Sequence, residues 1–298
     1  GDELVTASTS NLTETQKALT NGCGLTYDEY KTAYQKMLKS VYTYGGFWIG
    51  RYEAGIEGSI TDLTKARTGG TGGTGGITGP TSYDGTSVKV LKLATITTQS
   101  DNTNTLPKAI SQKDAIPYNW VTCSEAQSLA KEMTPNSNYT SSLMFGIQWD
   151  LVCQYLKAKG GLSESDINQD SSSWGNYKNA KIENITSGKY AILDTSTIKL
   201  GTWTKITNAF TKSDSGDNSR ALLSTGISEY TKKMNIYNFA GNEGEWTLEK
   251  TSDSNLPCAY RGGGCESSGF DFPASGRAGG PTIGSIGFIG FRSALYVN

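Results

Sequence analysis

Apolar residues recur at intervals of three and four in three stretches of the chain, which is the spacing of one face of an α-helix. Two of these stretches begin with a Thr-x-x-Glu capping box, in which the Thr and Glu side chains bond each other's backbone N–H groups. These two helices are predicted over residues 26–45 and 122–133. The third is predicted over residues 148–157, and two glycines follow it as a stop signal.

Alternating and β-branched or aromatic runs predict short strands between and after these helices. Residues 47–53 and 88–97 have this character in the first half of the chain. In the second half, residues 245–248 are predicted to pair with 258–263 as a hairpin, and residues 289–297 form a final strand. Few helices, short antiparallel strands and much loop predict an α+β fold.

Two polar, loop-rich insertions divide this pattern, at about residues 55–118 and 162–230. The first contains repeated Thr-Gly-Gly units, which are typical of a flexible surface loop. These glycines precede neither a Lys-Ser pair nor a helix, so a phosphate-binding loop is disfavoured. We therefore predict an N-terminal arm and helix over residues 1–44, packed on one domain over residues 45–298.

Composition excludes several classes of function. Of 298 residues, 27 are basic and 28 are acidic, and no basic tract occurs, so a nucleic-acid partner is not expected. No apolar run approaches the ~20 residues needed to cross a bilayer, so membrane insertion is not expected. Histidine is absent, which excludes Ser-His, Cys-His and His-metal chemistry.

Five cysteines are too few and too scattered for a disulfide framework. Cys123 and Cys153 fall on predicted helices and are interpreted as small buried apolar residues. Cys258 and Cys265 lie seven positions apart near the C-terminus. They are predicted to be free buried thiols or a local disulfide.

The last forty residues are rich in glycine, interleaved with bulky apolar residues that follow neither helical nor strand periodicity. This composition predicts an irregular surface loop rather than a core segment. Because loops held by a rigid scaffold commonly carry binding sites, we expect the functional surface here.

Four segments, taken in this order, resemble the formylglycine-generating-enzyme (sulfatase-modifying factor) type of the C-type lectin fold. They are Gly46-Phe-Trp-Ile-Gly-Arg-Tyr-Glu53, Pro117-Tyr-Asn-Trp-Val-Thr122 with its helix, Ala240-Gly-Asn242 with Glu245-Trp-Thr247, and Arg261-Gly-Gly263 with Gly290-Phe-Arg292. The resemblance covers the chain from about residue 45 to the end and leaves the two insertions unmatched. It implies a C-type lectin fold of this type with two long loop-rich insertions.

Enzymes of that family carry a redox cysteine pair just before the Gly-Phe-Arg segment, and this chain departs from the pattern. Residues 269–290 contain no cysteine, and Cys258 and Cys265 lie upstream of the expected place. We therefore expect no enzymatic activity. The alternative is an oxidase of the formylglycine-generating type that acts on a protein cysteine through Cys258 and Cys265.

The pattern Arg-Gly-Gly…Pro-Ala-Ser-x-Arg…Ile-Gly-Phe-Arg-x-Ala-Leu-Tyr is similar to the variable region of diversity-generating retroelement proteins. In that family a C-type lectin domain displays residues exchanged at asparagine-type codons, and the resemblance places such a region at about residues 261–292. Adenine replacement in those codons can produce every residue in the predicted exchangeable positions, but cannot produce Glu266. The predicted ligand-binding, variable positions are Ser268, Phe270, Asp271, Phe272, Gly276, Ala278, Gly279, Gly280, Ile283, Gly284, Ile286, Gly287 and Phe288.

A surface that changes its residues cannot contribute much to folding, so a buried framework should hold it. The tryptophans expected in this framework are Trp48, Trp149 and Trp246. Three guanidiniums are expected to bond loop carbonyls or Glu245, with ordinary surface charge as the alternative: Arg261, Arg277 and Arg292.

Five bulky residues of the variable region are expected to face solvent: Phe270, Phe272, Ile283, Ile286 and Phe288. Exposed apolar side chains mark an interaction site, which favours a protein partner with an apolar pocket, on a host or partner-cell surface. The alternative for Phe288 is a position in the core. We expect an extracellular location on a virion or cell surface, and no cofactor. Glu243 and Glu245 would suit a structural calcium ion. The alternative is that these two carboxylates only accept hydrogen bonds in the turn that leads into the strand.

Overall fold

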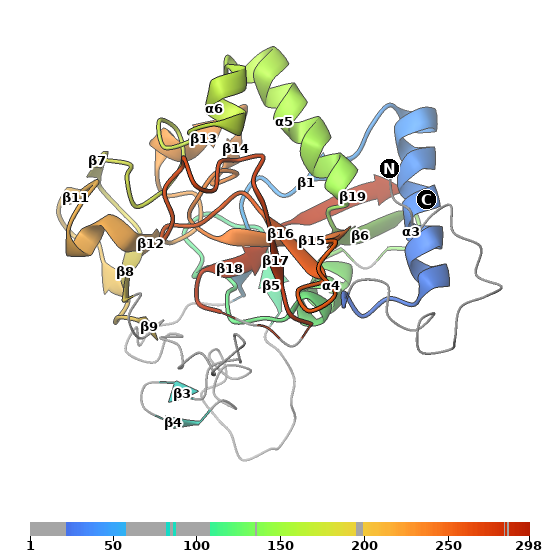
Figure 1. Cartoon of the computed structure of the whole chain (residues 1–298), viewed down its shortest axis with the longest axis horizontal. Helices are drawn as coiled ribbons and strands as arrows, with labels where there is room; N and C mark the ends of the chain where they lie inside the picture. Colours follow the sequence, from blue (N-terminus) through green and yellow to red (C-terminus); the bar gives the residue numbers. More distant parts are fainter. Residues whose placement is uncertain are drawn as a thin grey trace.

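The chain combines helices with many short strands, as Figure 1 shows. This computed structural model describes residues 22–57, 108–134, 136–194, 199–282, 284 and 286–298, together with the backbone of β3 (Ser82–Tyr83) and β4 (Thr86–Ser87). The predicted α+β class is confirmed. The strand predicted over residues 88–97 and most of the first insertion lie outside the described residues.

The three predicted helices are confirmed. They are α3 (Tyr27–Tyr44), α4 (Cys123–Glu132) and α5 (Gly146–Gly160), and a short α6 (Glu164–Asn168) follows α5. Both predicted capping boxes form, with Thr26 and Thr122 as the N-caps. Gly45 ends α3 with a φ of 83°, in the left-handed region that favours glycine.

Two sheets form the centre of the domain. One has the order β17-β16-β15-β18 and the other the order β1-β19-β6. The bounds are β1 (Trp48–Ile49), β6 (Tyr139–Leu143), β15 (Gly244–Lys250), β16 (Cys258–Arg261), β17 (Arg277–Gly280), β18 (Ile289–Phe291) and β19 (Ser293–Val297). The predicted β15–β16 hairpin pairs antiparallel and is confirmed.

The final strand predicted over residues 289–297 is two strands in two different sheets. β18 pairs parallel with β15, whereas β19 pairs antiparallel with β1 and β6. Arg292 is the single residue between them, so its side chain lies where the two sheets meet. A second short pair, β2 (Gly55–Ile56) with β5 (Ala109–Ile110), joins the ends of the first insertion.

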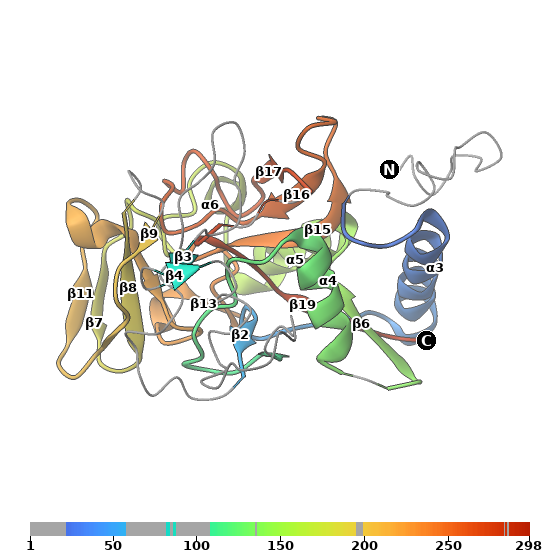
Figure 2. The same cartoon turned by 90° about the horizontal axis from the view of Figure 1, so that it is seen from below.

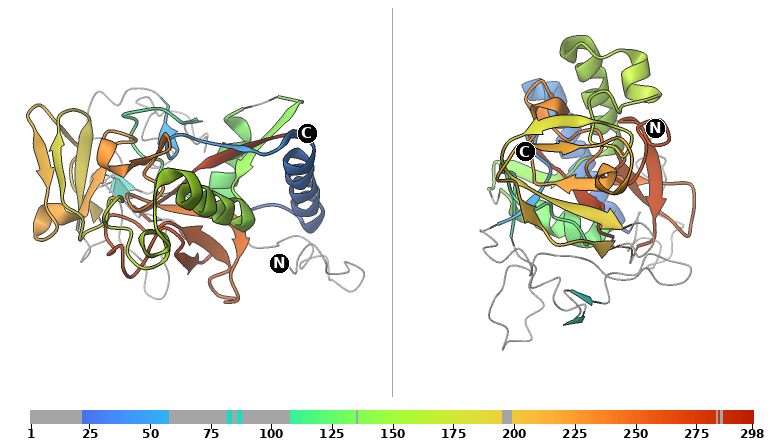
Figure 3. Two further views of the ribbon diagram at one scale, coloured as in Figure 1. Left: turned by 90° about the horizontal axis from the view of Figure 1, so that it is seen from above. Right: turned by 90° about the vertical axis from the view of Figure 1, so that its left-hand side faces the viewer.

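The second insertion is more regular than its polar sequence predicts. It contains β7 (Ile182–Ile185), β8 (Lys189–Asp194), β9 (Lys199–Leu200), β10 (Thr204–Lys205), β11 (Phe210–Lys212), the 3-10 turns η4 (Asp217–Arg220) and η5 (Glu229–Thr231), β12 (Ala221–Leu223), and the following pair β13 (Lys232–Lys233) and β14 (Ile236–Tyr237). Ile182, Ile185 and Leu223 belong to a separate apolar cluster in this region. Its strands lie at the end of the molecule opposite α3 (Figures 2 and 3).

Trp149 and Trp246 are buried in the core as predicted, but the prediction for Trp48 is wrong, because its side chain is 56% exposed. β1 is an edge strand, and successive side chains of a strand point to opposite faces. Phe47 and Ile49 pack against the core on one face, so Trp48 faces outward. Among the described residues, no helix is long and apolar enough to cross a membrane.

Candidate ligand-binding surface

The predicted variable region forms two connections on the same sheet. The first is the loop over residues 262–276, between β16 and β17, and the second runs from β17 to β18. Gly262 and Gly263 open the first loop with φ angles of 87° and 67°. A Cβ on Gly263 would lie 2.4 Å from the Phe272 carbonyl oxygen, so the two ends of the loop approach closely only because this residue is glycine.

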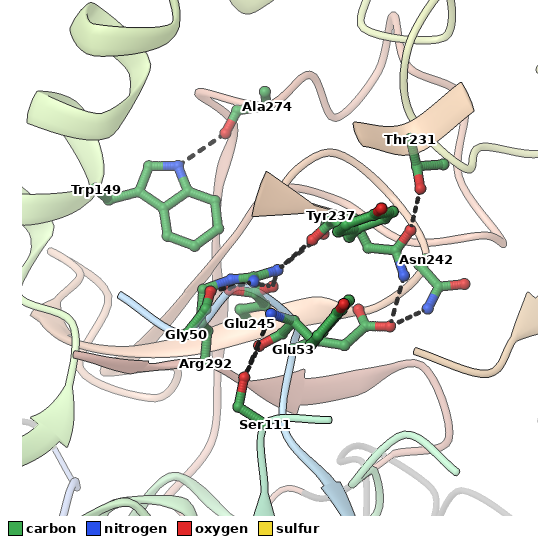
Figure 4. A network of polar contacts seen from close by, with 12 residues as sticks. Gly50, Glu53, Ser111, Trp149, Thr231, Tyr237, Asn242, Glu245, Ala274 and Arg292 are labelled. Atoms are coloured by element: carbon green, nitrogen blue, oxygen red, sulfur yellow. Dashed lines mark hydrogen bonds and ion pairs between the residues drawn. The ribbon is translucent and has the colours of Figure 1, made fainter. Parts of the chain in front are cut away.

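The backbone of this loop is anchored from beneath by residues of other elements. Trp149 Nε1 donates to the Ala274 carbonyl at 2.9 Å (Figure 4), and the Ala274 N–H donates to Ser171 Oγ at 2.8 Å. Tyr177 Oη donates to the Gly262 carbonyl at 2.6 Å. These bonds reach backbone atoms of the loop, so they do not depend on the side chains that the loop displays.

The segment of the loop between the anchored Gly269 and Ala274 presents two phenylalanines to solvent. Phe270 is 71% exposed and Phe272 is 39% exposed. Asp271 between them is also exposed, and Ser268 Oγ donates to its carboxylate at 2.6 Å. Four further predicted positions are partly exposed: Gly276, Ala278, Gly279 and Phe288.

The structure contradicts the expected exposure of several predicted positions. Ile286 is only 2% exposed and belongs to the main core, because its carbonyl accepts the Trp120 N–H and draws the chain inward before β18. Gly280, Gly284 and Gly287 are buried as well. Phe288 packs partly against the core, the alternative considered for it, and Ile283 lies outside the described residues.

Two of these buried glycines lie directly against an indole ring. A Cβ on Gly280 would lie 2.4 Å from the Trp246 ring, and one on Gly287 would lie 2.8 Å from the Trp120 ring. Exchange at these positions would therefore displace a buried indole. The surface that can change its residues without disturbing the core is accordingly smaller than the predicted set.

Arg292 holds the junction beneath the surface, as Figure 4 shows. Its guanidinium is buried and donates to Glu245 Oε1 at 2.7 Å, to the Gly50 carbonyl at 2.8 Å and to the Tyr237 carbonyl at 2.8 Å. Bonds from this arginine to Glu245 and to backbone oxygens were predicted, and they are confirmed. Together they connect both central sheets to the segment that precedes β15.

Glu53 lies next to this pair and is fully buried. Its Oε1 accepts from Asn238 Nδ2 at 3.0 Å and from Asn242 Nδ2, whereas its Oε2 has no hydrogen-bond partner among the described residues. Burial and the nearby Glu245 charge raise the pKa of Glu53 to about 8, with Arg292 and the two amides opposing the shift. The raised pKa of Glu53 favours its protonated form at neutral pH.

Arg261 and Arg277 bond carboxylates rather than loop carbonyls. Buried Arg261 donates from Nη1 to Glu249 Oε2 at 3.1 Å and from Nη2 to Asp150, and it lies over the Trp149 ring. Arg277, opposite it on β17, is half exposed and reaches Glu249 Oε1 at 2.5 Å. Glu249 therefore connects the buried Arg261 of β16 with the exposed Arg277, which begins β17 at the end of the loop.

The sulfur atoms do not form the arrangement of a redox pair at the surface. All five cysteines are buried, and none of them forms a disulfide in the described part of the chain. Burial raises the pKa of the Cys265 thiol well above its usual range, whereas a hydrogen bond with Cys123 lowers the pKa of the Cys258 thiol. Among the described residues, no group of three or more Cys, Asp or Glu side chains is arranged to hold a metal, and Glu245 is engaged by Arg292.

Several residues of this site had no role assigned from the sequence. Glu53 and Asn242 lie inside the recognised segments, yet nothing in their spacing reveals that they meet. Asn176, from the second insertion, donates to Asn242 Oδ1 at 2.7 Å. The only sequence signal for this contact is the segment Trp174–Tyr177, which has an aromatic residue at each end and lies within an otherwise polar region.

No protein-family model matches this chain, and no curated protein matches it. Among solved structures, the Treponema denticola variable protein 1 aligns with 17% sequence identity and a TM-score of 0.28. The alignment covers 56% of this chain and 52% of that chain, about half the length of each. Likeness at this level does not establish a shared fold.

Proposed function

We propose that this chain is a ligand-binding protein that displays a diversified surface on a C-type lectin fold of the formylglycine-generating-enzyme type. On this proposal it is a variable protein of a diversity-generating retroelement, located outside the cell on a virion or cell surface. It binds a protein of a host or partner cell, without enzymatic activity and without a cofactor. The four sequence segments and the framework pattern support the family.

One observation carries the proposal: Phe270 and Phe272 are exposed on a loop whose backbone is fixed by residues outside it. Exposed aromatic side chains on a rigid backbone supply contact area at low entropic cost. An apolar pair with Asp271 between its two members suits an apolar pocket on a protein better than a charged glycan. The proposed variable set is reduced to Ser268, Phe270, Asp271, Phe272, Ile283, Ala278 and Phe288. Gly276 and Gly279 are removed because a Cβ on either would lie 2.7 Å from a backbone carbonyl oxygen, of Pro273 and Leu256 respectively.

The oxidase alternative requires a reactive thiolate pair at an accessible place. Cys258 and Cys265 are both buried, and the raised pKa of Cys265 opposes thiolate formation. These features do not favour the alternative. Incubating the protein with a sulfatase-derived peptide and copper tests it directly, and turnover that disappears in Cys258→Ser would support it.

A display library tests the proposed binding surface. Randomising positions 268, 270, 271 and 272 should yield binders to many unrelated proteins, while the free energy of unfolding changes by no more than about 0.5 kcal/mol in most clones. The matched control randomises three exposed residues of α5, namely Ile147, Leu151 and Tyr155. Equal recovery of binders from both libraries would contradict the assignment of binding to this loop.

The gene supplies an independent test. On this proposal, the codons for residues 261–292 have an adenine-rich near-repeat beside a reverse transcriptase gene. A locus with neither feature would remove the diversification part of the proposal and leave a fixed binding loop.

A further inference from the structure

Three of the five buried cysteines lie close together in the main core. Cys23 precedes α3, Cys123 is the first residue of α4 and Cys258 is the first residue of β16. All three belong to the same apolar cluster, and each is at most 1% exposed. They are far apart in the sequence, so only the fold brings their thiols into one place.

Cys123 and Cys258 meet where α4 lies beside β15 (Figures 1 and 2). Cys123 Sγ lies 3.6 Å from the Thr247 carbonyl oxygen of β15. Thr247 Oγ1 donates to the Ala259 carbonyl of β16 at 3.1 Å, so the start of α4 reaches the pairing of these two strands. Cys258, the neighbour of Ala259, hydrogen-bonds the Cys123 thiol. The two thiols are therefore in direct contact.

The segment before α3 covers this pair. Gly22 has a φ of 76°, and a Cβ there would lie 2.6 Å from Cys258 Sγ and 2.6 Å from Thr282 Cγ2. Cys23 follows Gly22 and brings a third thiol to the cluster. The pKa of Cys123 is raised first by its hydrogen bond with Cys258 and also by burial and the Cys23 charge. Cys258 thus bonds Cys123 directly, whereas Cys23 acts on it through charge.

The two bonded thiols differ in acidity, which gives each a separate part in an exchange reaction. The hydrogen bond with Cys123 lowers the pKa of Cys258, although burial opposes the shift. Cys258 is therefore the more readily ionised sulfur, and a thiolate is the nucleophile in thiol–disulfide exchange. The raised pKa of Cys123 makes it the second thiol to react.

We propose that Cys123 and Cys258 form a disulfide bond when the protein meets a small disulfide such as oxidised glutathione. The Cys258 thiolate attacks one sulfur of that molecule and releases one glutathione thiolate. The Cys123 thiolate then attacks Cys258 Sγ of the mixed disulfide and releases the second. One sulfur–sulfur bond forms in the protein and one breaks in glutathione, and the two protons of the protein thiols pass to the two glutathione thiolates.

This bond joins α4 to the sheet that carries the candidate ligand-binding surface. Cys258 pairs with Gly280 at the end of β17, and both connections of the predicted variable region begin or end on β16 or β17. The inference rests on the proposed function only for the oxidising surroundings of an extracellular protein. Formation of the bond itself depends on the fold alone.

Peptide mapping of the full chain, after incubation with oxidised glutathione and digestion without reductant, tests the proposal. We expect the free thiols to fall from five to three, because one bond consumes two, and a cross-linked peptide to join Cys123 with Cys258. Refolding from urea in the same oxidant removes burial as an obstacle. Five remaining thiols in both treatments, glutathione adducts alone, or a bond between another pair would overturn the proposal. The display library measures binding instead, so the two failures are distinguishable.

Two variants test what the bond does to stability. Cys153→Ala is the matched control, since Cys153 is also buried but belongs to a different apolar cluster. Oxidation should raise its urea midpoint by roughly 1 M, because the bond closes a long stretch of the unfolded chain. Cys258→Ala should show no such rise. Equal shifts in the two variants would refute the assignment of the bond to this pair.

Discussion

Replacing Glu53 by Gln should change how stability depends on pH while leaving the fold intact. Glutamine retains an oxygen for the two amides that Asn238 and Asn242 donate. Its amide nitrogen takes the place of Oε2, the atom that has no hydrogen-bond partner among the described residues. The variant therefore resembles the protonated form of Glu53 at every pH.

The size of this pH effect on the free energy of unfolding follows from the raised pKa of Glu53, about 8 in the folded chain against an ordinary value of 4.5. The stability that the protonated Glu53 side chain allows is fully present below about pH 4.5, where folded and unfolded chains both carry the proton. It is lost as pH rises from 4.5 through 8, because the unfolded chain ionises first. The difference of 3.5 pH units corresponds to about 5 kcal/mol, an upper bound because relaxation around the buried charge reduces it.

Urea denaturation of both proteins from pH 5 to pH 9.5 measures this effect. The informative quantity is the difference in free energy of unfolding between Glu53→Gln and the unaltered protein, because other buried groups also titrate in this range. Burial lowers the pKa of Lys212 to about 8, so Lys212 adds stability as pH rises. Glu266, with a pKa raised to about 7 by burial, has the opposite trend, and both contributions cancel in the difference. Glu57→Gln, at an exposed position, is the matched control.

We expect Glu53→Gln and the unaltered protein to differ little at pH 5, and the variant to be more stable by several kcal/mol at pH 9. A difference that stays constant across this range would refute the reasoning, since it would mean that Glu53 does not change its protonation in the folded chain.

Three further changes test the frame around the surface, each by urea denaturation. Arg292→Met should cost about 3–5 kcal/mol because it leaves Glu245 charged and buried without its partner; a loss below 1 kcal/mol would contradict the role of this junction. Gly280→Ala should cost about 1–3 kcal/mol because its Cβ meets the Trp246 ring, whereas Ala278→Ser on the same strand should stay within about 0.5 kcal/mol. Thr122→Ala should cost about 1 kcal/mol through loss of the α4 cap, and an unchanged midpoint would show that this cap is dispensable.

The helices could be predicted from the sequence because their signals are local. Both capping boxes lie within four residues, and the apolar spacing of α3 depends on no distant contact. The β15–β16 hairpin was predictable for a similar reason, since the two strands are close in sequence. In each of these elements the stabilising contacts are made by residues near each other in the chain.

The remaining errors arise where burial depends on partners far away in sequence. Trp48 looks like a core residue, but its edge position in a sheet completed by β19 turns it outward. Ile286 looks like a loop residue, but the Trp120 backbone N–H draws its carbonyl inward across more than 160 positions. Periodicity within a short window contains no information about either partner.

The kind of contact that each loop residue makes with the rest of the fold explains how a loop could exchange its residues and keep its shape. Trp149 and Tyr177 donate to the Ala274 and Gly262 carbonyls, and Ser171 Oγ accepts the Ala274 N–H. Every residue type except proline offers both the same carbonyl and the same N–H. A substitution at Phe270 or Phe272 changes the surface without removing any of these bonds. Positions such as Gly280 and Ile286 differ, because there the side chain itself, or its absence, is part of the core. The boundary between exchangeable and fixed positions is therefore set by whether the framework bonds the backbone or packs against the side chain.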